Sequence, residues 1–531
     1  MREREVLICA QTVHLTGQVI SDLPVTEISS ETLVVDSAPP SMSAMPRSAS
    51  CSVPTAGTDV QGHSAALRKE LGLFDLVMAQ LLIIIVPDFI GTAVKAGTAH
   101  VFFWIIGTVF FFIPLAAVVI HMNRRLPLEG GLYEWVRIAF NDQLGFLVAW
   151  NVWMFAISYV GIAGFVTVGF ASYALPEAAW IASSKPTLAL VSVAVIFVTM
   201  GVAAFGLRLG KWVTNVSTLA FLLIVALLIF SPWLHMWRGS LKEYHPLSVV
   251  IPPLTLFSVS VFSKMTFGAL CSFEYVAALA GECRNPRQDL PRSVLVAAPI
   301  ITLVYILVTS AVRAFVPASA EDLVAPMAQA LSRGGAQAYG VHGIVLPAAI
   351  GGLFVNYIAT FCIMFGVCTR LPMVAGWDHL LPAWFSRLHP RYKTPLNSIL
   401  ILGAATLLFG IASSIGVSID EAYELLLMCS FTFYALAYLA LFAIPLFSPK
   451  QRGLRAGPWV KLAACSGFLS SLLYVILAVV PVMDLHDSSS YAMKIAVAVI
   501  STNLVAVIYY RTIGRKSASR AKFAESRADS R

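Results

Sequence analysis

The composition alone shows whether this chain is surrounded by water or by lipid. Of its 531 residues 58% are hydrophobic and 12% are charged, whereas about a quarter of the residues of a soluble domain are charged. The formal net charge of +8 would suggest a nucleic-acid or membrane-surface partner in a soluble protein, but the placement of the charges decides between them here, and we expect the lipid bilayer and no nucleic acid as a partner. No water-soluble core could enclose so much apolar surface. The composition therefore excludes a soluble enzyme and indicates a protein embedded in a lipid bilayer.

The two ends of the chain differ from its middle. Residues 1–70 lack a long apolar run and contain a stretch rich in Ser, Pro and Ala from Ser37 to Gly57, a composition that does not form a packed core. We expect a disordered cytosolic tail there, because the segment also lacks the pattern of a cleaved signal peptide. Residues 71–511 are predicted to form a transmembrane domain, and residues 512–531 a basic cytosolic tail.

Apolar runs about as long as a bilayer core is thick follow one another from residue 71 onward. They predict an all-α integral membrane protein with about 12 transmembrane helices. The segment Glu321–Leu331 is too short to cross and is predicted to be a short helical or interfacial segment. The expected spans are 72–94, 100–122, 143–172, 187–206, 212–231, 254–281, 292–316, 341–369, 395–413, 422–446, 458–482 and 492–511.

The positions of Lys and Arg predict the orientation. With the amino terminus inside, sixteen basic residues lie in inner loops and seven lie in outer loops, which is the asymmetry of the positive-inside rule. We therefore expect a multi-pass protein of the cytoplasmic membrane with both termini in the cytosol.

Motifs for other kinds of chemistry are missing from the sequence. The eight cysteines do not have metal-ligand spacing, and neither a Walker-type glycine loop nor an HExxH pattern occurs. We expect no metal, no cofactor and no nucleotide-driven pump. The energy for any transport would then come from a solute or ion gradient.

Two of the predicted spans contain residues that interrupt a helix. The first reads from Leu82 to Thr92 with Pro87, Asp88 and Gly91 inside it, and the sixth is polar and rich in small residues from Lys264 to Glu274. Irregular backbone inside a membrane is tolerated only beside protein or a cavity. Breaks in the first and sixth spans are what an inverted five-plus-five repeat with a central binding site predicts. The alternative is a simple kink and close helix packing.

Three sequence segments resemble the amino acid, polyamine and organocation permeases. Pro127–Val136 reads PLEGGLYEWV and is similar to the P-x-x-G-G-x-Y entry to the third span of that family. Gly145–Trp153 reads GFLVAWNVW and is similar to its G-F-x-x-G-W-x-x-W pattern. Ser272–Glu274, followed by Ala280–Arg292, resembles its G-F-E and E-x-x-N-P-x-x-D-x-P-R motifs. The resemblance extends over about residues 70 to 510.

The resemblance implies the fold of the leucine transporters, in which the broken first and sixth helices surround the solute. In this sequence Ser272 stands where the family usually has glycine, so we expect a stiffer break in the sixth span. The substrate-binding residues implied by the resemblance are Val86, Pro87, Asp88, Phe89, Ile90 and Gly91 in the first span and Phe267, Gly268, Ala269, Leu270, Cys271 and Ser272 in the sixth. Asn151 and Tyr159 in the third span, with Asn356 and Tyr357 in the eighth, are further candidates or else make contacts between helices.

Ionisable residues within the spans predict coupling or gating positions. Lys264 is the only Lys or Arg placed away from the ends of a span, and an unpaired charge there would cost several kcal/mol. We predict that Lys264 pairs with Asp88 near the site, and that one of them, or Glu274, changes its protonation during transport. The alternative is that Lys264 extends to the outer surface and Glu274 caps broken helix backbone. Glu282 is predicted to belong to an inner gate or to a solvated loop.

These observations favour a secondary transporter of an amino acid or related amine, working by alternating access as a proton-coupled symporter or an exchanger, without bond chemistry. The alternative is a transport-silent sensor or receptor on the same scaffold, which would bind the solute and signal through its tails. A channel is disfavoured, because no filter-like repeat occurs.

Overall fold

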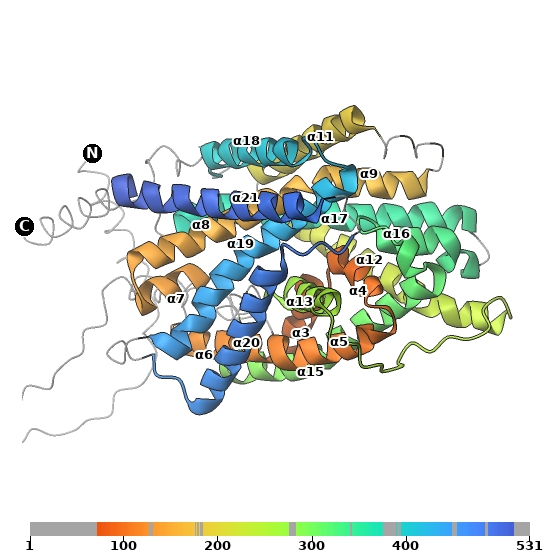
Figure 1. Ribbon diagram of the computed structural model, residues 1–531, viewed down its shortest axis with the longest axis horizontal. Coiled ribbons are helices and arrows are strands. Elements are labelled where there is room, and N and C mark those ends of the chain that lie inside the picture. Colours follow the sequence, from red (N-terminus) through yellow and green to blue (C-terminus); the bar gives the residue numbers. More distant parts are fainter. Residues whose placement is uncertain are drawn as a thin grey trace, which may run out of the picture. The chain divides into compact units, whose positions relative to one another are not determined.

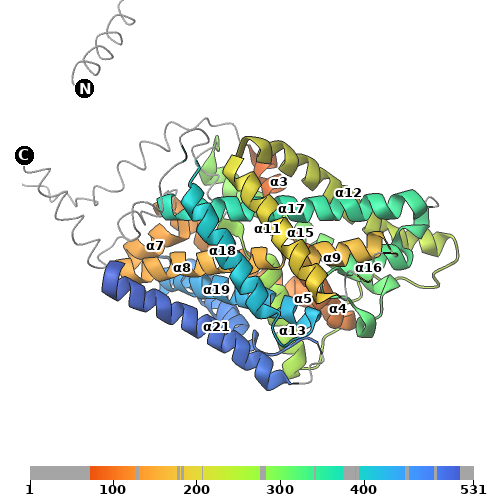
Figure 2. The same cartoon turned by 90° about the horizontal axis from the view of Figure 1, so that it is seen from above.

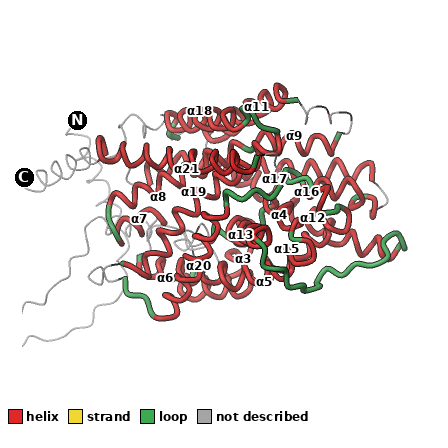
Figure 3. The backbone as a smooth tube through the Cα atoms, in the orientation of Figure 1, coloured by secondary structure: helices red, strands yellow, loops and turns green. Residues whose placement is uncertain are grey.

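The regular structure of the chain is helical, as the apolar runs predict. The computed structural model describes residues 72–126, 131–175, 177, 180, 184–205, 207–274, 283–339, 342–374, 389, 394–448, 454–483 and 487–514. All regular elements among these residues are helices (Figure 3). The predicted tail, residues 1–70, and most of the predicted tail 512–531 lie outside this part of the chain.

Helices and helix segments cover the predicted spans. They are α3 (Leu73–Ile84), α4 (Ile90–Lys95), α5 (His100–Gly107), α6 (Ile113–Arg125), α8 (Asp142–Gly161), α9 (Ala163–Ala174), α11 (Lys185–Phe205), α12 (Leu207–Trp237), α13 (Leu256–Leu270), α15 (Pro286–Phe315), α17 (His342–Val374), α18 (Leu396–Ser413), α19 (Ile419–Phe447), α20 (Pro458–Leu477) and α21 (Ser488–Tyr509). Shorter elements are η1 (Pro87–Phe89), η2 (Gly97–Ala99), η3 (Thr108–Phe112), α7 (Gly131–Ala139), η6 (Ala318–Ala320), α16 (Pro326–Ala330), η7 (Leu331–Gly335), η8 (Gln337–Tyr339) and η11 (Tyr510–Gly514).

Two of the twelve predicted spans are interrupted. In the described part of the chain, 10 helical segments are long and apolar enough to cross a membrane. The first and sixth spans are not among them, because α3 has 12 residues and α13 has 15 residues before each is broken. The all-α membrane fold with breaks in the first and sixth spans is therefore confirmed.

Side chains define where several helices begin. Asn141 caps α8 by accepting the Leu144 N–H at 2.8 Å, and Ser418 caps α19 by accepting the Glu421 N–H at 3.1 Å. Such caps satisfy backbone donors that a helix start leaves unbonded. These caps mark the starts of α8 in the third span and α19 in the tenth span, and the two helices pack against each other.

The broken spans lie among the other helices. The first half of the sixth span, α13, packs against α4, η1, α5 and α20 (Figure 1). The helix α15 packs along α3, and α17 packs against α8, α9 and α12. Helices α11 and α18 lie side by side, and α21 lies against α19 and α8 (Figure 2). Side chains of the third, seventh, eighth and tenth spans reach the two breaks.

Candidate functional site

Proline causes the break in the first span. Pro87 has no backbone N–H and crowds the residue before it out of the helical region. Val86 is accordingly extended, with φ −112° and ψ 140°, and the helix resumes only at η1 and α4. The backbone groups that the break frees are held by Tyr305 on α15, whose hydroxyl oxygen lies 2.6 Å from the Ile84 carbonyl and accepts the Val86 N–H at 3.0 Å.

The sixth span breaks at Cys271 and Ser272 without a proline. Cys271 is extended, and Ser272 has φ 78°, a left-handed conformation that strains any residue other than glycine. The Ser272 N–H donates to the Tyr438 hydroxyl at 2.7 Å. The Tyr305 hydroxyl lies 3.2 Å from the Ala269 carbonyl, so one side chain contacts both breaks.

Asp88 is buried between the third and eighth spans. Its carboxylate accepts hydrogen bonds from Tyr159 at 2.7 Å and from Tyr357 at 3.1 Å. The three side chains are at most 4% exposed. The structure therefore brings together three predicted site residues from three spans, and the partners of the carboxylate given by these bonds are neutral hydroxyls.

Phe89 and Gly268 show how closely the two broken helices approach each other. A Cβ atom at Gly268 would lie 2.1–2.4 Å from atoms of the Phe89 ring. The same ring meets Phe431 edge-on, with a centroid distance of 4.8 Å. Only glycine at position 268 leaves room for this ring between the two breaks.

Glu274 lies two residues beyond the strained Ser272. Its two carboxylate oxygens accept hydrogen bonds from Tyr434 and Tyr438, which are one turn apart on α19. Phe155 stacks on Tyr434 at 4.4 Å and on Tyr159 at 5.6 Å. An aromatic stack thus links the tyrosine that holds Glu274 to the tyrosine that holds Asp88.

The predicted pair of Lys264 and Asp88 is wrong. Lys264 lies 3.6 Å from Glu424 on α19, and its side chain is 0% exposed, so it does not extend to the surface either. Its position on α13, two turns before the break at Cys271, directs the side chain to α19 and to the chain after α20. Glu282, the fourth predicted gating residue, lies outside the described residues.

The other two polar candidates are not bonded to Asp88. Asn151 exchanges side-chain amide hydrogen bonds with Asn503 on α21 at 2.7 and 3.2 Å, which is a contact between helices. Asn356 is half-buried on α17, and its backbone carbonyl accepts the Thr360 hydroxyl at 3.0 Å. Of the four residues proposed to flank the breaks, Tyr159 and Tyr357 reach the carboxylate.

A segment between the seventh and eighth spans covers the end of the first span, in agreement with the short elements expected near 321–331. A Cβ atom at Gly91 would lie 3.2 Å from Leu323 Cα. Lys95 donates to the Ala318 carbonyl at 2.7 Å, and Tyr173 donates to Asp322 at 2.8 Å. Burial, followed by the nearby Asp322 charge, raises the pKa of Glu321 to about 9, so this carboxyl is neutral at pH 7. The segment between the seventh and eighth spans therefore packs over the end of α4.

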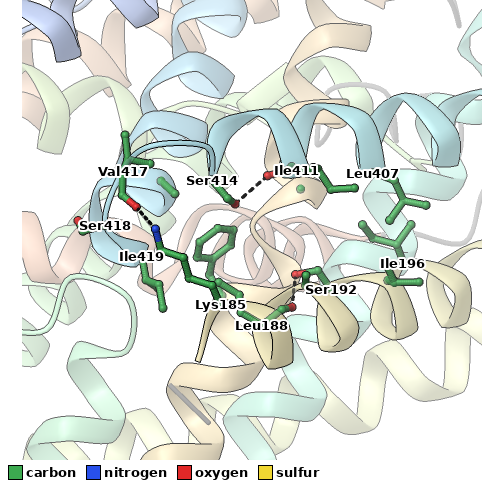
Figure 4. Close-up of a pocket in the computed structure, with 16 residues that line it drawn as sticks. Lys185, Leu188, Ser192, Ile196, Leu407, Ile411, Ser414, Val417, Ser418 and Ile419 are labelled. Carbon is green, nitrogen blue, oxygen red and sulfur yellow. Dashed lines mark hydrogen bonds between the residues drawn. The ribbon is translucent and has the colours of Figure 1, made fainter. Parts of the chain in front are cut away.

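A separate cavity of about 90 Å³ lies between α11 and α18, outside the predicted site (Figure 4). Apolar side chains such as Leu188, Ile196 and Leu407 line it, and Lys185 at one end donates to the Val417 carbonyl at 2.7 Å. No residue that lines this cavity belongs to the predicted binding or gating sets.

Sequence reasoning missed several residues of the site. Tyr434 and Tyr438 were detectable as a polar pair at i, i+4 spacing on one face of the tenth span. Glu424 is the only acidic residue in the predicted span 422–446, and an ionisable residue inside a span is a default functional candidate. Tyr305 carried no signal, because a tyrosine in an apolar helix is compatible with simple packing.

Together, the broken spans and the buried carboxylates between them define the class of the chain, a multi-pass membrane transporter. A family model described as amino acid permease matches residues 71–502, so the chain belongs to the amino acid permease family.

Individual relatives agree with this assignment. An uncharacterized transporter of Legionella pneumophila is 26% identical over 71% of this chain and 80% of its own length. The branched-chain amino acid permease BcaP of Bacillus subtilis is 23% identical over 65% of this chain and 75% of its own length. The crystal structure of MhsT in complex with L-phenylalanine matches with a TM-score of 0.51 at 15% identity, over 76% of this chain and 97% of MhsT. That likeness concerns the fold alone and supports the predicted leucine-transporter-like arrangement.

Proposed function

We propose that this protein moves an amino acid or a related amine across the cytoplasmic membrane by alternating access, driven by a proton gradient or by exchange against a second solute. The basic residues of the loops support an orientation with both termini in the cytosol. The family of the chain and the names of its relatives support small-molecule transport in general.

Asp88 is the observation that carries the proposal. A buried carboxylate in a membrane is costly unless a counter-charge or a proton accompanies it. The hydrogen bonds of Asp88 come from two neutral hydroxyls, Tyr159 and Tyr357, which orient the carboxylate without cancelling its charge. An ammonium group entering between the broken helices would supply that charge, and in its absence a proton could.

The remaining parts of the site have supporting roles in this proposal. Backbone groups of 86–91 and 267–272 would surround the solute, and Phe89 would close over it beside Gly268. Glu274, held by Tyr434 and Tyr438, is the second carboxyl that could carry a proton during the cycle.

Uptake by proteoliposomes tests the function. A panel of labelled amino acids and amines is offered with and without an inward proton gradient. Accumulation driven by the gradient supports symport, and uptake only into solute-loaded vesicles supports exchange. Binding without flux would contradict transport and favour the sensor hypothesis.

Asp88→Asn tests the role of the carboxylate. The amide keeps the shape of the side chain and removes its charge, so we expect uptake of ammonium-bearing solutes to fall by at least about tenfold, the factor that corresponds to one charge-assisted hydrogen bond. Asp75→Asn, at an exposed position at the start of the same span, is the matched control and should transport normally. Equal uptake by the two variants would exclude Asp88 as the ammonium site.

A further inference from the structure

The ion pair of Lys264 and Glu424 joins three elements that the solute site does not explain. Lys264 Nζ on α13 lies 3.6 Å from Glu424 Oε1 on α19. It also donates to the Val480 carbonyl at 2.5 Å, in the chain that follows α20. The Val482 N–H in turn donates to Glu424 Oε1 at 3.1 Å. The pair therefore holds the first half of the sixth span against the tenth span and against residues 480–482.

A second contact reinforces the same junction. Ser260 lies one turn before Lys264 on α13, and its hydroxyl lies 3.5 Å from the same Val480 carbonyl. Both side chains are fully buried, at 0% exposed. Two consecutive turns of α13 therefore direct polar groups at one carbonyl, while most of the other residues around them on this helix are apolar.

The pair is poorly explained by stability alone. Glu424 Oε2 is buried and makes no hydrogen bond of ordinary geometry in the described part of the chain, although the buried Tyr491 hydroxyl interacts with this carboxylate. Replacing a buried ion pair by apolar residues of similar volume is often neutral or stabilising, because desolvation offsets the attraction between the charges. Apolar surfaces in a bilayer can slide past each other, whereas a directional polar contact is either made or broken. Such a contact suits a junction that has two positions.

We propose that the Lys264–Glu424 pair is a latch that holds the first half of α13 closed against α19 and residues 480–482, and that its release opens the solute site toward the ends where α13 and α19 begin. The proposal rests on alternating access as the proposed function, in which the halves of the broken spans move to admit the solute. Lys264 and Glu424 are positioning residues in this proposal, because neither is bonded to Asp88.

Thiol labelling tests the latch without any solute. Ser260→Cys places a thiol at the junction, in a background in which the exposed Cys465, the half-buried Cys362 and the two cysteines of the predicted tail, Cys9 and Cys51, are replaced by serine. Full-length protein in proteoliposomes is then treated with a membrane-impermeant maleimide, with and without the double substitution K264M/E424Q. The double variant removes both charges at nearly constant volume, whereas Lys264→Met alone would leave Glu424 as an unpaired buried charge. We expect the thiol introduced at position 260 to react at least about tenfold faster in the double variant, as one lost charge-assisted hydrogen bond predicts.

A second thiol separates a latch from general loosening. Thr406 on α18 is also 0% exposed, and its hydroxyl donates to the Leu402 carbonyl of its own helix rather than to the latch. Thr406→Cys in the same background should therefore label slowly with and without the double substitution. Unchanged labelling of the Ser260→Cys protein would overturn the proposal, and so would equal acceleration of the Ser260→Cys and Thr406→Cys proteins. Because no solute is needed, this experiment can succeed even if the proposed amine specificity fails.

Discussion

The two breaks that build the site have different physical origins. In the first span the break is local, because Pro87 lacks a donor and forces Val86 into an extended conformation that its own sequence favours. In the sixth span the break is imposed, because Ser272 takes a left-handed conformation that serine disfavours. Tyr438 and Tyr305, which lie on other spans, bond the groups that this second break frees.

The difference shows that a local break and an imposed break respond oppositely to substitution. Where the local sequence already favours the non-helical backbone of the break, a substitution that removes this preference should lower the free energy of unfolding. Where tertiary contacts hold a residue in a conformation that it disfavours, a residue that adopts this conformation easily should raise the free energy of unfolding. The following variants test the comparison, from the largest expected effect to the smallest.

Gly268→Ala should have the largest effect. Its Cβ atom would meet the Phe89 ring at 2.1–2.4 Å, and that ring is itself packed against Phe431. We expect a loss of about 3 kcal/mol in the free energy of unfolding, near the upper end of typical overpacking penalties, and loss of uptake. Thermal unfolding in detergent and proteoliposome uptake measure the two effects. Gly351→Ala on α17, where a Cβ atom has no neighbour within 4 Å, is the control. Similar behaviour of the two variants would mean that the breaks do not approach as closely as described.

Tyr305→Phe should weaken both breaks at once. The hydroxyl that it removes contacts backbone groups of Ile84, Val86 and Ala269. The Val86 N–H also donates to the Ile84 carbonyl at 2.9 Å, so the loss comes mainly from the weakened contacts and from the Ala269 carbonyl, and a buried backbone group without a partner costs about 1–3 kcal/mol. A lower midpoint of thermal unfolding would measure this loss. Tyr474→Phe is the matched control, because its buried hydroxyl interacts with the Met428 sulfur at 3.7 Å and with the Thr432 side chain, and neither partner is a backbone group. A smaller loss for Tyr305→Phe than for Tyr474→Phe would contradict the shared role of Tyr305.

Ser272→Gly should stabilise the protein. Glycine adopts the left-handed conformation without the penalty of about 1 kcal/mol that a side chain carries, so the unfolding midpoint should rise. Ser272→Ala keeps the strain and removes only the hydroxyl, and it should leave the midpoint close to that of the parent. A decrease for Ser272→Gly would show that the sixth break is not strained.

Pro87→Ala should have the smallest effect, and it should destabilise the protein, whereas Ser272→Gly should stabilise it. Alanine enlarges the conformational freedom of the unfolded chain and releases Val86 from its extended preference, so we expect a loss of about 0.4–1 kcal/mol. The same unfolding measurement applies. If Pro87→Ala stabilised the protein instead, the first break, like the sixth, would be held by tertiary contacts rather than by its local sequence.

Much of the fold could be predicted because its signals are local. The long apolar runs predicted the spans, and Pro87 predicted the first break. Asp88, Tyr159 and Tyr357 were each predicted from the fold that the family resemblance implies, but their meeting at one carboxylate depends on how three helices pack. The partner of Lys264 was predicted wrongly, because proximity of the first and sixth spans does not specify the direction in which a side chain points.

The sequence by itself determined that this chain is embedded in a membrane, that it crosses about a dozen times and where its first helix must break, since hydropathy and proline geometry act within a few residues. Only the tertiary structure decided that Ser272 is strained, that Tyr305 contacts both breaks and that Lys264 pairs with Glu424. These contacts join residues far apart in the chain, so they depend on which faces of the helices meet rather than on any local preference.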